Sequence, residues 1–441
     1  MAEQMMQGKA SEIVAKQIIP AGYKQTEVGV IPKDWEVMLV GDSFTVCNNL
    51  RLPISSKVRD GMSGSYPYYG PTKIQGYINE YRVEGEFALI GEDGDHFLKF
   101  DSVNQTQLVS GKFNVNNHAH LIKGNVGSAK WFYWFFRNLD ISIYLTRQGA
   151  GRFKLNKASL ERIQCAIPPT EEQLAITTVL SDSDALIVSL EQLIAKKQAI
   201  KTASMQQLLT GRTRLPQFAR GPDGAPKSYK SSELGQIPED WDVVCAGDLG
   251  KFRGGNGFPV IEQGKLNGEY PFYKVSDMNN EGNDVYMSAS NNWISKEDQS
   301  RIGSFVFPSG CIVFAKVGAA VFLERKKILS MPSCIDNNMA ALELNIAKCD
   351  VNFVYHFLQS IRFGDFVSTT ALPSLNASVL SKIKIIMPLI KEQTAIATIL
   401  SDMDNELQAL TQKLEKARAL KQGMMQQLLT GHIRLLLPKE A

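Results

Sequence analysis

The chain has 441 residues, so a single hydrophobic core cannot hold all of it and at least two domains are expected. Hydrophobic residues make up 44% and charged residues 21%, as in soluble globular proteins, and no apolar run comes near the roughly 20 residues that cross a bilayer. The net charge of +3 excludes a globally polybasic protein but allows a local basic surface, because phosphate binding needs clustered Lys and Arg rather than a high pI.

The N-terminal segment has acidic residues and no apolar core, so we expect no secretory signal. Its "AEQMMQG" faintly echoes a later "MQQLLTG", and residues 1–22 are therefore interpreted as a helical extension. The six cysteines (47, 165, 245, 311, 334 and 349) form no CxxC pair, which favours a reduced cytoplasmic location.

An internal repeat organises the rest of the chain. "YKQTEVGVIPKDWEV" (Tyr23–Val37) returns as "YKSSELGQIPEDWDV" (Tyr229–Val243), 206 positions later. "MQQLLTG" occurs at Met205–Gly211 and at Met425–Gly431, 220 positions apart. The offset rises from 206 to 220 between the first motif and the second. The regions between these two motifs therefore differ in length in the two repeats, and they also differ in sequence.

These inner regions have a mixed α/β pattern. Short β-rich runs such as "EFALIG" and "CIVFAKVG" lie between Gly, Asn, Asp and Pro turns. Only fragments match between the regions: "YPYY" at Tyr66 with "YPFY" at Tyr270, "NNHAHL" at Asn116 with "NNMAAL" at Asn337, and "LN" at Leu155 with Leu375. The aromatic segments "AKWFYWFFRNL" and "VNFVYHFLQSI" are interpreted as helices whose rings pack in the core.

Each repeat ends in a long predicted helix. "EQLAITTVLSDSD" and "EQTAIATILSDMD" begin two helices that Gly211 and Gly431 end. Apolar residues recur at alternating spacings of three and four. Lys197, Lys201 and Ser204 interrupt this pattern in the first helix, and Lys421 interrupts it in the second. The predicted seam residues are Leu180, Ile187, Leu190, Ile194 and Leu208 in the first helix, and Leu400, Met403, Leu407, Leu410, Leu414, Met424 and Leu428 in the second.

The predicted fold is therefore mixed α/β, with two globular domains joined by two long helices. Helices of ~40 residues are ~60 Å long, too long to be buried in domains of ~120 residues. Pseudo-two-fold symmetry favours an antiparallel coiled coil. The predicted segments are the extension 1–22, a first domain 23–168, a helix 169–211, a linker 212–228, a second domain 229–388, a helix 389–431 and a tail 432–441.

The sequence lacks the usual signatures of catalysis. It has neither a GxGxxG after a strand nor a GxxxxGK[ST], and "IPPTEE" does not match the adenine-methylation motif. His118 and His120 in "HAH" are spaced to chelate a metal from one face of a strand, but no further Cys or His lies nearby. "LERKK" (Leu323–Lys327) is interpreted as a solvated charged loop, so we expect no catalytic residue and no metal site.

Two unlike domains on a symmetric frame suit a ligand with two unlike half-sites, and duplex DNA is such a ligand. Arg, Lys, Asn and Gln on Gly-rich loops are the residue types that reach base edges and phosphates. The candidate DNA-binding residues are Arg51, Lys57, Arg59, Arg147, Gln148, Arg152 and Lys154 in the first domain, and Lys251, Arg253, Asn256, Lys274, Asn279, Asn280, Arg325, Lys326 and Lys327 in the second.

Over nearly its whole length the chain resembles the DNA specificity (S) subunits of type I restriction–modification systems. The resemblance rests on "ELGQIPEDW", on the Leu-Asn element, on "IPPTEEQ" and "MPLIKEQ" with the "LSDSD" and "LSDMD" runs, and on "MQQLLTG". It implies two target recognition domains that each read one half of a bipartite asymmetric sequence. It also implies an antiparallel coiled coil that sets their spacing, so four extra residues before Gly211 are expected to shift the preferred gap by one or two base pairs.

The same resemblance implies partners and excludes cofactors on this chain. Its framework is expected to dock two methylation (M) subunits and restriction (R) subunits, with S-adenosylmethionine, ATP and Mg on those partners and no membrane contact. Two other functions stay open: a self-contained DNA methyltransferase or nuclease, and a coiled-coil adaptor that binds two proteins.

Overall fold

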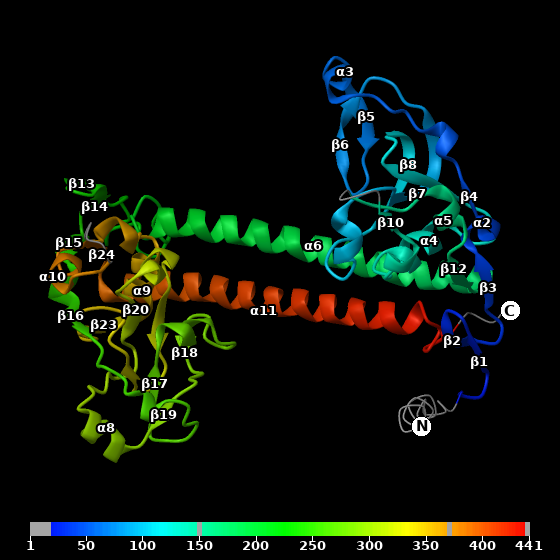
Figure 1. Cartoon of the computed structure of the whole chain (residues 1–441). Coiled ribbons are helices and arrows are strands. Elements are labelled where there is room, and N and C mark those ends of the chain that lie inside the picture. Colours follow the sequence, from blue (N-terminus) through cyan, green and yellow to red (C-terminus); the bar gives the residue numbers. More distant parts are fainter. Residues whose placement is uncertain (1–18, 148–151, 368–372, 437–441) are drawn as a thin grey trace, which may run out of the picture. The chain divides into compact units, whose positions relative to one another are not determined.

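The computed structural model describes residues 19–147, 152–367 and 373–436 (Figure 1). The chain divides into two compact units, and the division falls inside the long helices rather than at their ends. Unit 1 runs to Ser189 and takes up the chain again from Leu414, whereas unit 2 is Leu190–Lys413. Most of the predicted N-terminal extension and half of the predicted tail lie outside the described residues.

Unit 1 is built on a six-stranded sheet in the order β4-β9-β7-β8-β5-β6, in which only the β5–β8 pairing is parallel. Small two-stranded pairs β1–β2, β3–β12 and β10–β11 flank it. Its strands are β1 (Tyr23–Thr26), β2 (Gly29–Pro32), β3 (Glu36–Leu39), β4 (Phe44–Val46), β5 (Ser63–Tyr69), β6 (Ile74–Ile78), β7 (Val83–Gly91), β8 (Thr106–Val115), β9 (Ala119–Gly124), β10 (Thr146–Arg147), β11 (Phe153–Lys154) and β12 (Gln164–Ile167). Its helices are α2 (Val40–Ser43), α3 (Ser56–Asp60), α4 (Ala129–Phe136) and α5 (Lys157–Glu161), together with parts of α6 (Thr170–Leu208) and α11 (Ile390–Leu428).

Unit 2 repeats this plan with a divided sheet. Five strands follow the order β16-β23-β20-β21-β18, and β19-β17-β22 form a separate sheet. Its strands are β13 (Tyr229–Ser232), β14 (Gly235–Pro238), β15 (Asp242–Cys245), β16 (Gly250–Gly254), β17 (Tyr270–Tyr273), β18 (Tyr286–Met287), β19 (Trp293–Ile294), β20 (Ile312–Ala315), β21 (Lys326–Leu329), β22 (Cys334–Ile335), β23 (Met339–Leu344) and β24 (Lys384–Met387). Its shorter helices are α7 (Ala246–Leu249), α8 (Lys296–Ile302), α9 (Val351–Gln359) and α10 (Ala377–Leu380).

The aromatic helices α4 and α9 pack in the cores, as the sequence predicts. Ser128 caps α4 and Asp350 caps α9, because each side chain accepts a hydrogen bond from the backbone three residues on. Trp131, Phe132 and Trp134 of α4 are buried. Burial of rings of this size is a large part of the free energy that stabilises each unit.

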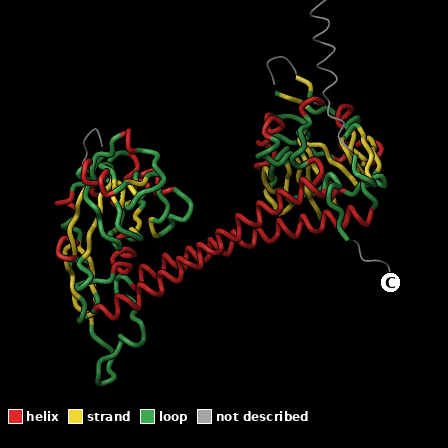
Figure 2. Tube along the Cα trace, turned by 90° about the horizontal axis from the view of Figure 1, so that it is seen from below, coloured by secondary structure: helices red, strands yellow, loops and turns green. Residues whose placement is uncertain are grey.

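The long helices run antiparallel in each unit, where Figures 1 and 2 show them side by side. In unit 1, Lys421 of α11 pairs with Asp184 of α6. In unit 2, Lys197 of α6 pairs with Glu406 of α11 at 2.7 Å, and Lys201 pairs with Asp404. Higher residue numbers on α6 meet lower numbers on α11, so the predicted antiparallel arrangement is confirmed.

The lysines that interrupt the apolar seam therefore have partners. Lys201·Asp404 and Lys421·Asp184 are related by the same 220-residue offset, and the lysine side chains are only 12% and 13% exposed. Of the predicted seam residues, Leu180, Leu190, Leu208, Leu400, Leu414 and Leu428 are buried, and Ile187, Ile194, Met403, Leu407, Leu410 and Met424 are half-buried.

The repeated "DW" motif closes each unit onto both long helices. In unit 1 the Trp35 indole donates to Glu172 at 2.9 Å, and Arg434, beyond the end of α11, binds both Glu172 and Asp34. The Arg434 hydrogen bond lowers the pKa of Asp34.

Unit 2 builds the same network from the equivalent residues. The Trp241 indole donates to Glu392 at 3.0 Å, and Arg214, beyond the end of α6, binds Glu392 and Asp240. Each network joins the motif that begins one repeat, the start of one long helix and the end of the other. The sequence repeat is thus a repeat of one structural joint.

Within the described part of the chain, α6 is the one helix that length and composition alone would allow to cross a membrane. Part of this apolar composition belongs to the seam that α6 forms with α11, where Lys201 is also placed. Other apolar side chains of α6, such as Leu174 and Val188, are exposed.

Candidate nucleic-acid interface

Three segments meet at the end of a central strand in each unit, and we call this meeting point the strand-end junction. In unit 1, Glu92 follows β7, its N–H donates to the His118 carbonyl at 2.8 Å, and its carbonyl accepts from Leu155 N–H at 2.8 Å. In unit 2, Lys316 follows β20 and makes the same two bonds, with Asn338 at 2.8 Å and Leu375 at 2.9 Å. The backbone frame is therefore shared, whereas the side chains differ.

The junction also corrects a sequence match. The match of "NNHAHL" with "NNMAAL" aligns Asn116 with Asn337. The hydrogen bonds show instead that Asn116 is structurally equivalent to Asp336. Asn116 Oδ1 accepts from His118 N–H at 2.9 Å, and Asp336 Oδ1 accepts from Asn338 N–H at 3.2 Å. A one-residue shift preserves this turn, because its geometry needs an acceptor side chain two residues before the N–H that donates to it.

In unit 1 the junction gathers predicted residues from distant segments. Glu92 accepts from Arg51 at 2.5 Å and pairs with Lys154 at 3.4 Å. Beside it, Asp93 bonds the half-exposed His118 at 2.7 Å. Arg51 also donates to the Asn117 carbonyl at 3.1 Å. The result is an alternation of cations and anions, which can present both donors and acceptors to base edges.

In unit 2 the junction has a different chemistry. Lys316 replaces the acidic Glu92, and its ammonium group lies beside Gly254 of the Gly-rich segment. Asn256 is held there, since its Oδ1 accepts from Phe305 N–H at 2.9 Å. Burial raises the pKa of Asp336, which accepts from the Asn338 amide at 3.1 Å.

Three predicted arginines stack on aromatic rings. The Arg59 guanidinium lies 5.1 Å from the ring centre of Tyr68, and Arg147 lies 5.2 Å from Phe153. Arg253 is the closest, at 3.8 Å from Phe305. Stacking on a ring orients a guanidinium while leaving its N–H groups at the surface.

The other predicted residues differ in exposure. Lys57, Arg147, Arg152, Lys251, Arg253 and Asn279 are exposed, and Arg51, Arg59, Lys154, Asn256, Lys274, Asn280, Arg325 and Lys327 are half-buried. Lys274 donates to Gln263 at 2.9 Å, Asn280 to Asp277 at 3.3 Å, and Lys327 to the Asp284 carbonyl, so these side chains also brace loops of unit 2. Gln148 lies outside the described residues.

The assignment of Lys326 to DNA binding is wrong. Its side chain is 1% exposed, pairs with Glu324 at 2.8 Å and donates to the Ile361 carbonyl at 3.0 Å. Burial lowers the pKa of Lys326. The interpretation of "LERKK" as a solvated loop is wrong for the same reason: Glu324 also accepts from the N–H groups of Phe363 and Gly364 at 2.8 Å, so this charge pair fastens two core segments together.

The two histidines of "HAH" are not arranged as a chelating pair. His120 is buried in β9, where one ring nitrogen contacts the Asn48 amide at 2.9 Å and the other the Leu155 carbonyl at 2.7 Å. His118 precedes the strand and pairs with Asp93. The described residues contain no cluster of three or more His, Cys, Asp or Glu that could hold a metal ion.

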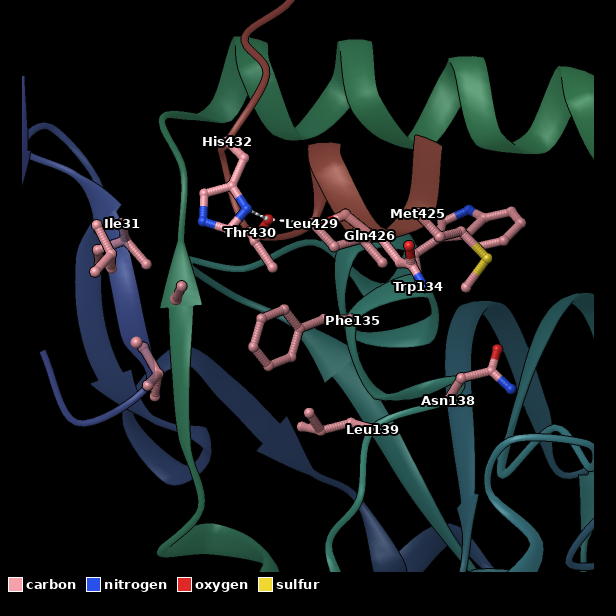
Figure 3. Close-up of a pocket in the computed structure, with 14 residues that line it drawn as sticks. Ile31, Trp134, Phe135, Asn138, Leu139, Met425, Gln426, Leu429, Thr430 and His432 are labelled. Atoms are coloured by element: carbon pink, nitrogen blue, oxygen red, sulfur yellow. Dashed lines mark hydrogen bonds between the residues drawn. The ribbon is translucent and has the colours of Figure 1, made fainter. Parts of the chain in front are cut away.

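Unit 1 also contains an apolar cavity of 420 Å³ against the end of α11 (Figure 3). Trp134, Phe135 and Leu139 line it from one side and Met425 and Leu429 from another. Among the described residues of its lining only His432 is ionisable, and the figure shows that its ring bonds Thr430, at 3.1 Å. This lining offers packing surface rather than paired acid and base groups.

Sequence reasoning missed Glu92, Asp93, Lys316 and the joint arginines 214 and 434. A signal was present for all of these except Asp93. Glu92 and Lys316 both follow a buried β-rich run directly, and the two arginines occupy matched positions in "GRTRL" and "GHIRL". Polar residues at the ends of buried strands are common sites of recognition.

Comparison with known proteins places this geometry in one family. The model of the type I restriction modification DNA specificity domain matches residues 32–202 and 238–418. The chain is 30% identical over 378 residues to a putative type I restriction enzyme specificity subunit of Haemophilus influenzae, covering 84% of this chain and 88% of the relative. It is 25% identical over 417 residues to the MjaVIII specificity subunit of Methanocaldococcus jannaschii, covering 92% and 94%.

The fold has a solved counterpart. The S subunit of a type I restriction–modification system from M. genitalium aligns with a TM-score of 0.61 at 15% identity, over 89% of this chain and 96% of that one. The family model matches both repeats, and the chain belongs to the type I restriction–modification DNA specificity family.

Proposed function

We propose that this chain is the DNA-reading subunit of a type I restriction–modification complex, with one recognition domain in each unit. Each domain reads one half of a bipartite asymmetric target, and the helix pair sets the spacing of the halves. The observation that carries the proposal is the strand-end junction, where the same backbone bonds present Glu92 in unit 1 and Lys316 in unit 2. Two domains that recognise different DNA sequences need the same backbone framework with different side chains at the contact positions.

The chemistry of the complex is assigned to its other subunits. Methylation subunits, two for the two repeats, carry S-adenosylmethionine, and restriction subunits use ATP and Mg. This chain binds double-stranded DNA in the cytoplasm and contributes no catalytic residue. The duplication supports docking of a repeated partner, because the same joint of a buried tryptophan, a buried glutamate and an arginine gives the two units equivalent frameworks.

The test is to map methylated adenines genome-wide in a host that carries this chain and its methylation subunit. One bipartite sequence with a constant gap is the expected result. A charge reversal at the junction, Glu92→Lys, is expected to change or abolish one half-site and leave the other unaltered. Scattered methylation without a bipartite consensus would contradict the proposal.

Two biochemical outcomes would support the alternatives. Transfer of labelled methyl groups to DNA, or cutting, by the purified chain alone would identify a self-contained enzyme. Failure to retard any DNA at low or high salt, even with the methylation subunit present, would identify a protein adaptor, since specific and non-specific DNA binding both depend on salt.

A further inference from the structure

An apolar loop projects from unit 2 between β16 and β17. We define the apolar loop as Phe258–Lys265. Val260 and Ile261 are adjacent and each is 83% exposed, and Leu266, which follows the loop, is 71% exposed. Single exposed aliphatic residues are ordinary, but neighbouring branched side chains held in water mark a contact surface.

The apolar loop is rigidly anchored at both ends. The Phe258 ring stacks on Phe272 of β17 with centroids 3.8 Å apart and an interplanar angle of 6°. The Gln263 amide donates to the Phe258 carbonyl at 3.1 Å and accepts from Lys274 at 2.9 Å. The side chain of Glu262 turns inward and is only 5% exposed. Val260 and Ile261 are thus held outward by neighbours that are fixed.

The charges near the loop are used to hold it. Glu262 binds Arg301 at 2.5 Å and also Lys265, and Lys265 reaches Asp298 at 2.9 Å. Two cations and two anions therefore neutralise one another around the base of the loop. The outer surface that remains is aliphatic, so this loop is not built as a phosphate clamp.

The loop occupies the same place in the repeat as a different structure in unit 1. Phe272 corresponds to Tyr68, because "YPFY" matches "YPYY". The Tyr68 hydroxyl donates to the Leu52 carbonyl at 2.7 Å and so anchors the segment that leads into α3. There the exposed apolar residue is Val58, between Lys57 and Arg59. Both recognition domains thus present a segment of different sequence, anchored on an equivalent ring, before the same strand.

We propose that Val260 and Ile261 contact 5-methyl groups of thymine in the major groove of the half-site that unit 2 reads. The inference rests on the proposed function. Phosphates are anionic and most base edges carry donors or acceptors, whereas the thymine methyl group is the apolar feature of the groove floor. Branched aliphatic side chains on an anchored loop can bury that methyl group and cannot form hydrogen bonds.

The test uses the complete complex of this chain with its methylation subunit and duplexes that carry the mapped target. Each thymine of the unit 2 half-site is replaced in turn by uracil, which removes only the methyl group. We expect binding to weaken about fourfold for each contacted methyl group. The variant Val260→Ser/Ile261→Ser is expected to bind thymine DNA about tenfold more weakly and to be insensitive to uracil at the same positions.

Ile346→Ser is the matched control, because Ile346 is a 78% exposed aliphatic residue of unit 2 outside the apolar loop. This control is expected to bind like the unaltered complex. If the unaltered complex binds no sequence specifically, the proposed function itself fails. If it binds specifically but no thymine is sensitive to uracil, or the double variant retains full affinity or full uracil sensitivity, the inference is overturned and the function stands.

Discussion

The glutamates at the starts of the two long helices bind equivalent partners in different surroundings. Glu172 and Glu392 are both 2% exposed. The partner of Glu172, Arg434, is 38% exposed, whereas Arg214, the partner of Glu392, is 4% exposed. A charge that loses its partner can be hydrated only if water reaches it, so equivalent substitutions should not have equivalent effects.

We predict that Glu392→Gln destabilises unit 2 by about 3 kcal/mol, because it leaves the Arg214 guanidinium buried with one remaining carboxylate, Asp240. Glu172→Gln should cost about 1 kcal/mol, since water and Asp34 both reach Arg434. The measurement is urea unfolding followed by tryptophan fluorescence, as Trp241 and Trp35 bond these glutamates directly. Equal losses in the two variants would contradict this reading of burial.

His356 is a second residue with a measurable consequence. Its ring is 1% exposed, and burial lowers its pKa from about 6.5 to about 4. Its Nε2 contacts the Ser401 hydroxyl at 3.2 Å, whereas Nδ1 has no hydrogen-bond partner. The equivalent position in unit 1 is Trp134, whose indole donates to Ser181 at 3.3 Å.

A depressed histidine pKa means that the unfolded chain binds the proton more readily than the folded one. His356 therefore contributes full stability above pH 6.5, and this contribution is lost as the pH falls toward 4, by up to about 1.4 kcal/mol per pH unit. His356→Gln keeps a polar group near Ser401 and should flatten the dependence over this range. Unfolding titrations at pH 7.5, 5.5 and 4.5 test it, and an unchanged slope in the variant would refute the assignment.

At the scale of elements, the seam between α6 and α11 combines apolar residues with placed charges. Lys201·Asp404 and Lys421·Asp184 lie at equivalent points of the two repeats. Burial lowers the pKa of Lys421, and the hydrogen bond to Asp184 opposes that shift. Polar residues on a coiled-coil seam reduce stability but define register and orientation.

We predict that Lys201→Leu destabilises unit 2 by about 2 kcal/mol, because Asp404 is left on the seam without its cation. The double variant Lys201→Leu/Asp404→Leu should recover that loss, since an apolar pair fits the seam. A double-mutant cycle measured by urea unfolding gives the coupling energy. Losses that simply add would show that the pair is not coupled.

At the scale of the whole molecule, each long helix continues from one unit into the other without a break. The ion pairs show why lengthening α6 alone is not a clean change: four residues before Gly211 would leave the seam intact but displace Arg214 from Glu392. A change of spacing has to lengthen both helices by a whole heptad.

We predict that one heptad inserted between Leu190 and Ile194 together with one between Leu410 and Leu414 increases the preferred gap between half-sites by about three base pairs. Seven helical residues add about 10 Å, and base pairs rise 3.4 Å. Methylation of substrates that differ only in gap length is the readout. An unchanged optimum would refute the role of the helix pair in spacing, and a heptad in α6 alone serves as the control that should lose stability instead.

Much of the architecture was predictable because the sequence contains an internal repeat. The duplicated "IPKDW" and "IPEDW" motifs, the heptad spacing and the glycines at 211 and 431 are local signals. The glycines are required: both have positive φ, 71° and 69°, and a Cβ atom at either would collide with Pro238 or Pro32.

The recognition surface was less predictable, because composition does not distinguish a basic residue that stabilises the fold from one that is available to contact DNA. Lys326 and Lys57 have the same side chain, yet one is buried against Glu324 and the other is exposed. The position of Glu92 after a buried β-rich run marks it as a candidate, but its pairing with Arg51 and Lys154 is visible only in the structure.

The sequence by itself determined the two repeats, the long helices with their seam and the family. These features depend on the spacing of apolar residues and on motifs that are repeated along the chain. Tertiary structure alone decided which charges pair across the helices, which basic residues are buried and which segments form each junction. Those contacts join residues such as Glu172 and Arg434 that are far apart in the chain. Their energies depend on burial and distance, which no local pattern encodes.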